Sequence, residues 1–226
     1  MEMKRFIPEI NNLEDWSKLL ADPVLHWKEG YSAYELANSW VNSDAFPPLV
    51  EEVLNNSGFD ELNGLAIDVL YPERKTSLND AGRPSQTDLM VFATERKGKV
   101  VIAVEGKVDE PFGPLVSERN DGGEATLKRL NFLCQELGLP LEEVMSIRYQ
   151  LLHRSCAGIL EAEKINATTV LFLVHSFSDK DSSFNDYQAF LSLFNKKNVI
   201  PNKIFKLARL KEIHFFSGWI KDKKSP

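Results

Sequence analysis

The sequence predicts an α/β fold in which helices flank a mixed β-sheet and an N-terminal helical arm precedes it. Apolar residues recur at helical spacing through the first forty-odd residues, the period becomes strand-like from Leu65, and helical spacing returns at about Glu124 before further strands. This order of elements differs from a regular βαβ repeat, so a mixed sheet is expected. In the chain of 226 residues we expect residues 1–45 to form the arm, packed on the core, and residues 46–226 to form the α/β domain.

Two helices are expected before the sheet. Ser32 followed by Glu35 matches a capping box, which begins a helix that runs through Trp40. The pair Pro47-Pro48 then begins a second helix, LVEEVLNN, which ends near Gly58.

Three strands follow in close succession. The first is LAIDVLY, and a polar loop, ERKTSLNDAGRPS, comes after it. The next two are TDLMVFAT and KVVIAVEGK, joined by residues 95–98. Because VVIAV is apolar on both faces, the third strand is expected to be central and covered on each side.

The second half of the chain returns to helices. One helix is expected from about Glu124 to Leu137, with Gly138 at its end, and another from about Leu141 to Lys164. A buried strand TTVLFLVHSF, a short helix YQAFLSLF and an edge strand KEIHFFSGWI complete the expected elements.

Composition narrows the class of protein. Hydrophobic residues make up 43% of the chain, enough for a folded core, and no uncharged apolar run approaches the roughly 20 residues that span a bilayer. The start of the chain lacks a signal-like stretch, so we expect a cytoplasmic location and no membrane partner. The net charge of −6 argues against a protein that coats nucleic acid non-specifically, but not against an enzyme whose basic groups gather in a cleft. Cys134 and Cys156 form no CxxC pair, so buried free thiols are expected.

The second and third strands bring three charged residues together. If the hairpin turn is centred between Arg96 and Lys97, opposed residues have numbers that sum to 193, and Asp88 lies opposite Glu105. Directly opposed side chains share a face, with Cβ atoms about 5 Å apart. Lys107 is two residues beyond Glu105 and therefore shares that face.

This cluster has the chemistry of a divalent-metal site. Two carboxylates at that spacing can chelate a hard cation such as Mg²⁺, and a lysine beside them can orient or deprotonate a metal-bound water. The alternative is a structural cross-strand cluster in which Lys107 pairs with a carboxylate. Because charge in a central buried strand is costly unless it is paired or metal-bound, the position of Glu105 favours a functional site.

The motif and its setting resemble a known superfamily. Asp88, then Glu105-Gly106-Lys107 at the end of the next strand, after a helix and a first strand, resembles the PD-(D/E)XK nucleases, which share a restriction-endonuclease-like α-β-β-β-α-β core. The resemblance covers about Pro47 to Phe177, and the blocks VEGKVDEPFG and RYQLLHR are similar to those of an uncharacterised bacterial family within the superfamily. One departure is Thr87, which stands directly before Asp88 where the motif has proline.

The resemblance implies a Mg²⁺- or Mn²⁺-dependent nuclease that hydrolyses phosphodiesters of DNA in preference to RNA. Asp88 and Glu105, with the Gly106 carbonyl, would hold the metal, and Lys107 would serve the attacking water. Such nucleases often carry a glutamate on the helix before the first strand, which makes Glu51 or Glu52 a further candidate ligand. Either one also fits a solvated helix carboxylate, and spacing does not separate them. Glu35 is already explained by its capping box.

The long helix offers further candidates. Gln150 and Arg154 are one turn apart, and Tyr149 pairs similarly with His153. Because superfamily members often present a glutamine or arginine from this helix, Gln150 and Arg154 are candidate catalytic residues, and Tyr149 and Arg154 candidate substrate-binding residues. Arg154 would bind a phosphate or hold a carboxylate in place; the alternative is an ion pair with Glu161 or a neighbouring acid.

Other charged residues allow two interpretations each. Arg83, with Arg74 and Lys75 in the same expected loop, would contact a nucleic-acid backbone or would simply be solvated. Asp109 and Glu110 would be further ligands or would lie on a turn after the strand. The histidines, at positions 26, 153, 175 and 214, show no metal-binding spacing.

Two rival functions stay open at this point. A catalytically inactive nuclease-like domain that binds protein or nucleic acid is favoured by the acidic pI near 5.4 and by the lack of an evident DNA-binding module. A metal-dependent hydrolase of another phosphate ester is the third possibility. The sequence does not predict strand type, sequence preference, pathway or oligomeric state.

Overall fold

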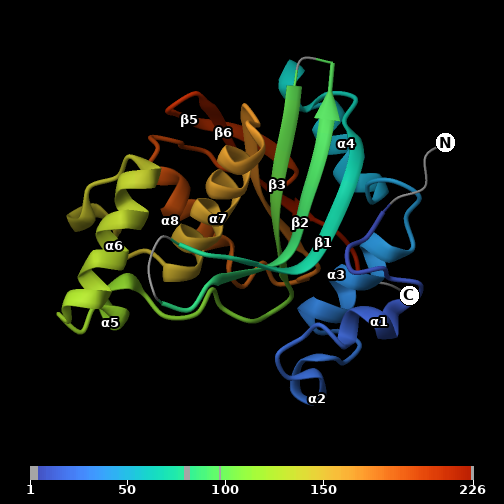
Figure 1. The fold of residues 1–226 in the computed structure, drawn as a ribbon, viewed down its shortest axis with the longest axis horizontal. Helices are drawn as coiled ribbons and strands as arrows, with labels where there is room; N and C mark the ends of the chain where they lie inside the picture. Colours follow the sequence, from blue (N-terminus) through green and yellow to red (C-terminus); the bar gives the residue numbers. More distant parts are fainter. Residues whose placement is uncertain (1–4, 79–81, 97, 225–226) are drawn as a thin grey trace.

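The computed structural model describes residues 5–78, 82–96 and 98–224, which form an α/β structure around one six-stranded sheet (Figure 1). The order across the sheet is β1-β2-β3-β4-β6-β5. Strand β3 runs parallel to β4, and β4 parallel to β6, while the other neighbours are antiparallel, so the sheet is mixed and open. The strands are β1 (Ala66–Thr76), β2 (Ser85–Glu95), β3 (Gly98–Lys107), β4 (Thr169–Ser176), β5 (Lys203–Leu210) and β6 (Ile213–Lys221).

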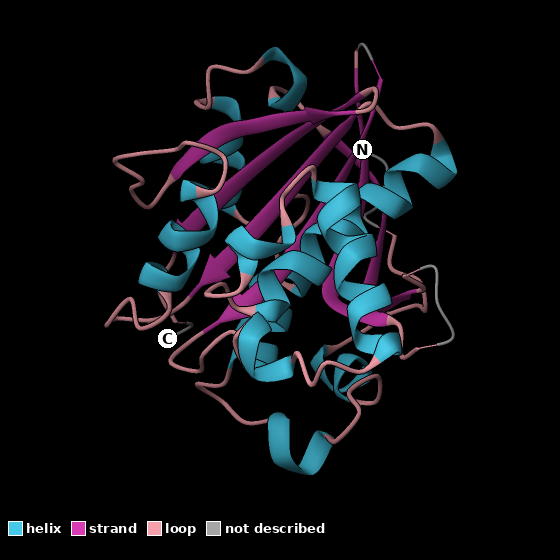
Figure 2. Ribbon diagram, turned by 90° about the vertical axis from the view of Figure 1, so that its left-hand side faces the viewer, coloured by secondary structure: helices cyan, strands magenta, loops and turns pink. Residues whose placement is uncertain are grey.

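Helices cover both faces of the sheet. One face carries α1 (Leu13–Ser17), α3 (Ser32–Val41) and α4 (Pro48–Asn55), with the short α2 (Pro23–His26) beyond them. The other face carries α5 (Val116–Arg119), α6 (Glu124–Leu137), α7 (Tyr149–Ile165) and α8 (Phe184–Ser192). Figure 2 shows this second layer in front of the strands. Short 3₁₀ helices lie at Asp60–Leu62 and Leu141–Val144.

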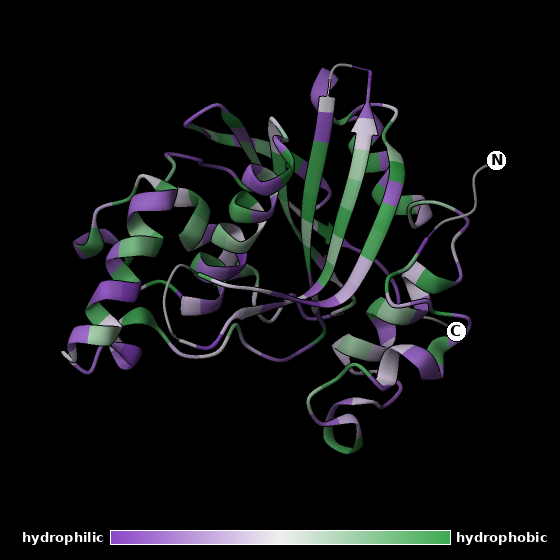
Figure 3. Cartoon of the chain, viewed as in Figure 1, coloured by the Kyte–Doolittle hydropathy of each residue, from purple (hydrophilic) through white to green (hydrophobic). Residues whose placement is uncertain are grey.

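The two hydrophobic cores meet at β3, as its sequence predicts. Val101 and Ala103 pack toward α6 and α7, whereas Ile102 and Val104 pack toward α3 and α4. All four are fully buried, and Figure 3 shows β3 hydrophobic over most of its length. Because successive side chains of a strand point to opposite faces, odd-numbered residues of β3 face one helical layer and even-numbered residues face the other.

Three expectations about elements are wrong. Strand β1 continues to Thr76 instead of ending in a polar loop at residue 72, which places Arg74 and Lys75 in the strand. The edge of the sheet is β5, which the sequence does not reveal, and β6 lies between β4 and β5. The two are joined at Lys211, which has a positive φ of 54° without being glycine or asparagine, so the turn lacks its usual signal.

The expected long helix from Leu141 is interrupted. A 3₁₀ turn ends at Val144 and α7 begins only at Tyr149. The backbone between them bonds to another segment, because the carbonyls of Ile147 and Met145 accept hydrogen bonds from the N–H groups of residues 116 and 117. These tertiary bonds replace the intrahelical ones.

Helix α3 begins at the expected place by a different contact. Ser32 is its first residue, not its N-cap, and Tyr31 occupies the cap without a side-chain hydrogen bond. Instead of closing a capping box, the Glu35 carboxylate accepts a hydrogen bond of 2.8 Å from the Gly30 N–H.

A buried polar chain ties α3 to the sheet and to the C-terminal segment. Trp40 donates its indole N–H to His175 Nδ1 at 3.1 Å, and His175 Nε2 lies 3.1 Å from Asp222 Oδ2. His175 is fully buried on β4.

Among the helices of the described residues, none has the length and apolar character required to span a membrane.

Candidate metal-binding and catalytic site

The β2–β3 hairpin has the register that places Asp88 beside Glu105. Leu89 pairs with Val104 and Glu95 with Gly98, so opposed residues sum to 193 along the whole ladder. Lys97, part of the expected turn centre, lies outside the described residues. The Gly106 N–H donates a hydrogen bond of 2.9 Å to Asp88 Oδ2, which anchors the carboxylate at the end of the ladder.

Alternation along β3 separates the two sides of the motif. Glu105 and Lys107 are on the same face of the strand as Ala103, toward α7, whereas Gly106 is on the opposite face, toward α3. A Cβ on Gly106 would lie 3.2 Å from both Leu36 Cβ and the Ser32 carbonyl oxygen. The glycine therefore permits α3 to pack directly on the strand that carries the charged residues.

Glu105 is the centre of the polar cluster. Its Oε1 lies 2.9 Å from Lys107 Nζ and also accepts from the Gln150 amide, while its Oε2 accepts from Arg154 Nε at 2.6 Å. Its side chain is only 2% exposed. A carboxylate this deeply buried stays ionised because cationic partners compensate it.

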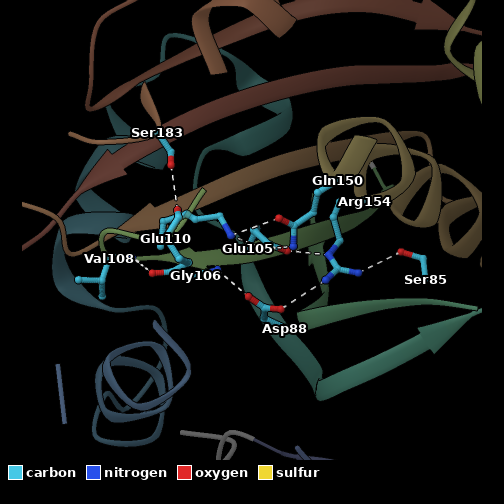
Figure 4. Close-up of polar contacts among 10 residues, drawn as sticks. Ser85, Asp88, Glu105, Gly106, Val108, Glu110, Gln150, Arg154 and Ser183 are labelled. Carbon is cyan, nitrogen blue, oxygen red and sulfur yellow. Dashed lines mark hydrogen bonds and ion pairs between the residues drawn. The ribbon is translucent and has the colours of Figure 1, made fainter. Parts of the chain in front are cut away.

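Arg154 lies between the two carboxylates. Its Nη2 is 3.7 Å from Asp88 Oδ1, and its Nη1 donates to Ser85 Oγ at 3.2 Å (Figure 4). The expected alternative is an ion pair with Glu161 or a neighbouring acid. Glu161 is not the partner, because it pairs with Arg74 and Lys164. The acids that pair with Arg154 are Glu105 and Asp88.

The pKa values of the two carboxylates are shifted in opposite directions. Burial, and then the charge of Glu105, raise the pKa of Asp88 well above its usual range. Burial alone would also raise the pKa of Glu105, but the charges of Arg154 and Lys107 hold it below the ordinary value. Asp88 is therefore short of positive charge in its surroundings, and its side chain remains 23% exposed to the adjoining cavity.

A third carboxylate, Glu73 on β1, joins this cluster. The flanking pairs Pro72–Leu89 and Arg74–Thr87 place it opposite Asp88. It accepts a hydrogen bond of 2.7 Å from the Gln86 amide, and burial raises its pKa to about 7. Glu73 is absent from the candidates that the sequence predicts, because the polar run after Pro72 predicts a loop. The long connection between β1 and β2 does not fix their register, so the sequence offers no signal for its position.

The cluster opens into a cavity of about 850 Å³. Gln150, Arg154 and Tyr149 all line it, as does the segment that follows β3. Tyr149 is largely buried, its hydroxyl accepts from Arg129 Nε at 2.7 Å, and its ring stacks against His153.

Asp109 and Glu110 also line this cavity, but they lie past the end of β3, on the turn. Asp109 accepts hydrogen bonds from the hydroxyls of Ser178 and Ser182. One carboxylate oxygen of Glu110 accepts from the Val108 N–H, as Figure 4 shows.

Several other candidates are not brought to the cluster. Glu51 and Glu52 are exposed on α4, whose buried face packs toward β5 and β6, and neither lines the cavity. Arg74 pairs with Glu161, and Lys75 is exposed. Arg83 is exposed and lines a separate, neighbouring pocket.

A metal-ligand group of three or more side chains is absent where the chain is described. No set of histidine, cysteine, aspartate or glutamate side chains there, the carboxylates of Glu73, Asp88 and Glu105 included, has that arrangement. Both cysteines are free and buried, as expected. His153 is buried beside Ser85, and burial, then the charge of Arg154, lower its pKa well below the ordinary value.

Comparison with known proteins gives one match. A family model described as "Domain of unknown function (DUF6946)" matches residues 9–224, nearly the whole chain. No curated protein and no solved structure is significantly similar to the chain.

Proposed function

This chain belongs to the DUF6946 family, and we propose that it is a Mg²⁺- or Mn²⁺-dependent nuclease that hydrolyses phosphodiester bonds, in DNA rather than RNA. The observation that carries the proposal is the group formed by Asp88, Glu105 and Lys107 at the mouth of a cavity large enough for a nucleotide. Buried, incompletely compensated charge at a cavity is typical of functional sites.

The arrangement of the sheet supports a restriction-endonuclease-like fold. A helix precedes three antiparallel strands, helices follow, and β4 then runs parallel to β3. This is the α-β-β-β-α-β order of the PD-(D/E)XK nucleases, and the charged motif lies on the second and third strands of that core.

The donor set fits a hard divalent cation. Asp88 and Glu105 offer carboxylate oxygens, and burial together with the charge of Glu105 raises the pKa of Asp88, a strain that a bound cation would relieve. Asp88, Glu105 and the Gly106 carbonyl would hold the ion. When bound, such an ion supplies Lewis-acid stabilisation of charge that develops on a phosphate.

The protein groups have separate tasks in this proposal. Lys107 Nζ is held by Glu105 Oε1 and, at 3.3 Å, by Gln150 Oε1, which positions its ammonium group to orient a water and to stabilise charge that develops on a phosphate. Its Nζ also lies 4.7 Å from the centre of the Phe112 ring, so little solvent reaches it. Arg154 holds both carboxylates in place and offers donors to a phosphate.

The test is cleavage of labelled single-stranded DNA, double-stranded DNA and RNA with Mg²⁺ or Mn²⁺. Lys107→Ala should lower the rate by about 100-fold or more, the usual cost of removing one positioned donor that stabilises charge in the transition state. Lys99→Ala, at the exposed far end of the same strand, is the matched control and should retain activity. A wild type inactive on every substrate, or a Lys107→Ala protein as active as wild type, would contradict the proposal.

One observation favours a second candidate, a catalytically inactive binding module. Arg154 already lies between Asp88 and Glu105, and a guanidinium in that position supplies positive charge without a metal. Calorimetric titration with Mg²⁺ and Mn²⁺ separates the two: heat of binding that Asp88→Asn abolishes supports the nuclease, whereas no binding at millimolar metal supports the module.

A further inference from the structure

A second pocket, of about 660 Å³, adjoins the catalytic cavity. It lies between residues 82–84, α5, the first half of α6 and the start of α7. Arg119, Tyr149 and His153 line both spaces, so the two pockets are direct neighbours and share these side chains.

The lining of this pocket is basic. The described residues that line it include the cations Arg83, Arg119, Lys128 and Arg129 and no carboxylate. We call these four residues the basic pocket. The whole chain carries a net charge of −6, so this local excess of positive charge runs against the overall composition.

Two of these cations contact neutral groups of the pocket wall. Arg129 donates from Nε to the Tyr149 hydroxyl and from Nη2, at 2.8 Å, to the carbonyl of Arg83. The Arg119 guanidinium lies 4.4 Å from the centre of the Tyr149 ring. Within the described part of the chain, Arg83, Arg119 and Lys128 form no ion pair.

Nearby acidic residues are directed elsewhere. Glu118 and Asp121 are close to Arg119 in sequence, but their carboxylates accept hydrogen bonds from the N–H groups of Leu115, at 2.7 Å, and Gly123, at 2.9 Å. Their hydrogen bonds with backbone donors leave the positive charges of Arg83, Arg119 and Lys128 to an external anion.

We infer that the basic pocket binds a backbone phosphate of the nucleic-acid strand whose scissile phosphodiester lies at Lys107. This rests on the proposed function, because the shared lining of Arg119, Tyr149 and His153 places the pocket directly beside the catalytic cavity. The planar guanidinium group of arginine can donate two hydrogen bonds to the oxygens of one phosphate. Contacts with backbone phosphates fix the position of a nucleic-acid strand without recognising its base sequence.

The test is fluorescence anisotropy with a labelled oligonucleotide of about 15 nucleotides, single- or double-stranded, in EDTA so that no cleavage occurs. Arg119→Ala combined with Lys128→Ala should weaken binding at least about 10-fold and reduce the salt slope by roughly 0.7 to 0.9 for each phosphate that the variant no longer neutralises. Arg83→Ala, an exposed change that keeps the carbonyl used by Arg129, should weaken binding as well.

The matched control removes the same charge elsewhere. Lys197→Ala with Lys203→Ala takes two exposed lysines from the C-terminal part of the chain, and neither lines the pocket. Affinity that falls equally in test and control, affinity unchanged in the test variants, or no binding by wild type would each overturn the inference. Binding in this assay needs neither metal nor Lys107, so the two proposals can fail separately. If the protein binds through this pocket but never cleaves, only the proposed function is contradicted. If variants that lack the basic pocket still cleave at the wild-type rate, only this inference is contradicted.

Discussion

Replacing Glu73 by glutamine should stabilise the protein at neutral and basic pH. The Glu73 carboxyl is buried opposite Asp88, and burial raises its pKa from 4.5 to about 7. A glutamine keeps the size of the side chain and an acceptor for the Gln86 amide, while it removes the charge. The native state therefore no longer has to ionise a buried acid.

The magnitude follows from the pKa. The folded state binds the proton of Glu73 more tightly than the unfolded chain, so stability is lost as pH rises from 4.5 through about 7. At about 1.4 kcal/mol for each pKa unit, this difference corresponds to about 3 kcal/mol above pH 7. For a domain of this size, that is a rise in melting temperature of roughly 6 to 12 °C.

The assay is thermal and urea unfolding of wild type and Glu73→Gln at pH 4 and pH 8. The gain should appear at pH 8 and vanish at pH 4, where Glu73 is protonated in the folded state and largely so in the unfolded chain. Glu52→Gln, on the exposed face of α4, removes the same charge and should shift stability by less than about 0.5 kcal/mol. A gain in stability of equal size at both pH values, or no gain at pH 8, would refute the inference that ionised Glu73 destabilises the folded protein.

Three further outcomes follow from the packing around the site. Arg154→Ala should lower the free energy of unfolding in urea by about 3 kcal/mol, because Glu105 stays buried with one cation fewer. Mn²⁺ should restore more stability to this variant than it adds to wild type, and an unchanged urea midpoint in the variant would contradict the prediction. Gly106→Ala should cost about 1 to 3 kcal/mol, because its Cβ would press on Leu36, and a wild-type melting temperature would count against the close approach of α3. Both cysteine thiols should resist an aromatic disulfide reagent at pH 8 until the protein is unfolded, and a fast-reacting thiol in the native protein would show that one of them is accessible.

The hairpin is the most predictable part of the molecule. A short connection fixes the register of an antiparallel pair, so the numbers of Asp88 and Glu105 alone place them side by side. Because side chains alternate along β3, Lys107 then lies on the same face of the sheet as Glu105. Gln150 and Arg154 follow from helical spacing, although only the packing of α7 on β3 brings them to Glu105.

Other features depend on tertiary contacts that the sequence does not encode locally. Glu73 lies in a polar stretch that becomes a strand only because β2 pairs with it. Strand β5 is hidden because its turn at Lys211 has no glycine or asparagine. Glu51 and Glu52 lie on the helix where the resemblance implies a glutamate, but the buried face of α4 turns both to solvent.

The most direct test of the proposed site is anomalous diffraction from crystals soaked in Mn²⁺. We expect a peak within about 2.5 Å of carboxylate oxygens of both Asp88 and Glu105, with the Arg154 guanidinium displaced from between them. No peak at this position, with Arg154 still between the two carboxylates at saturating metal, would contradict the account.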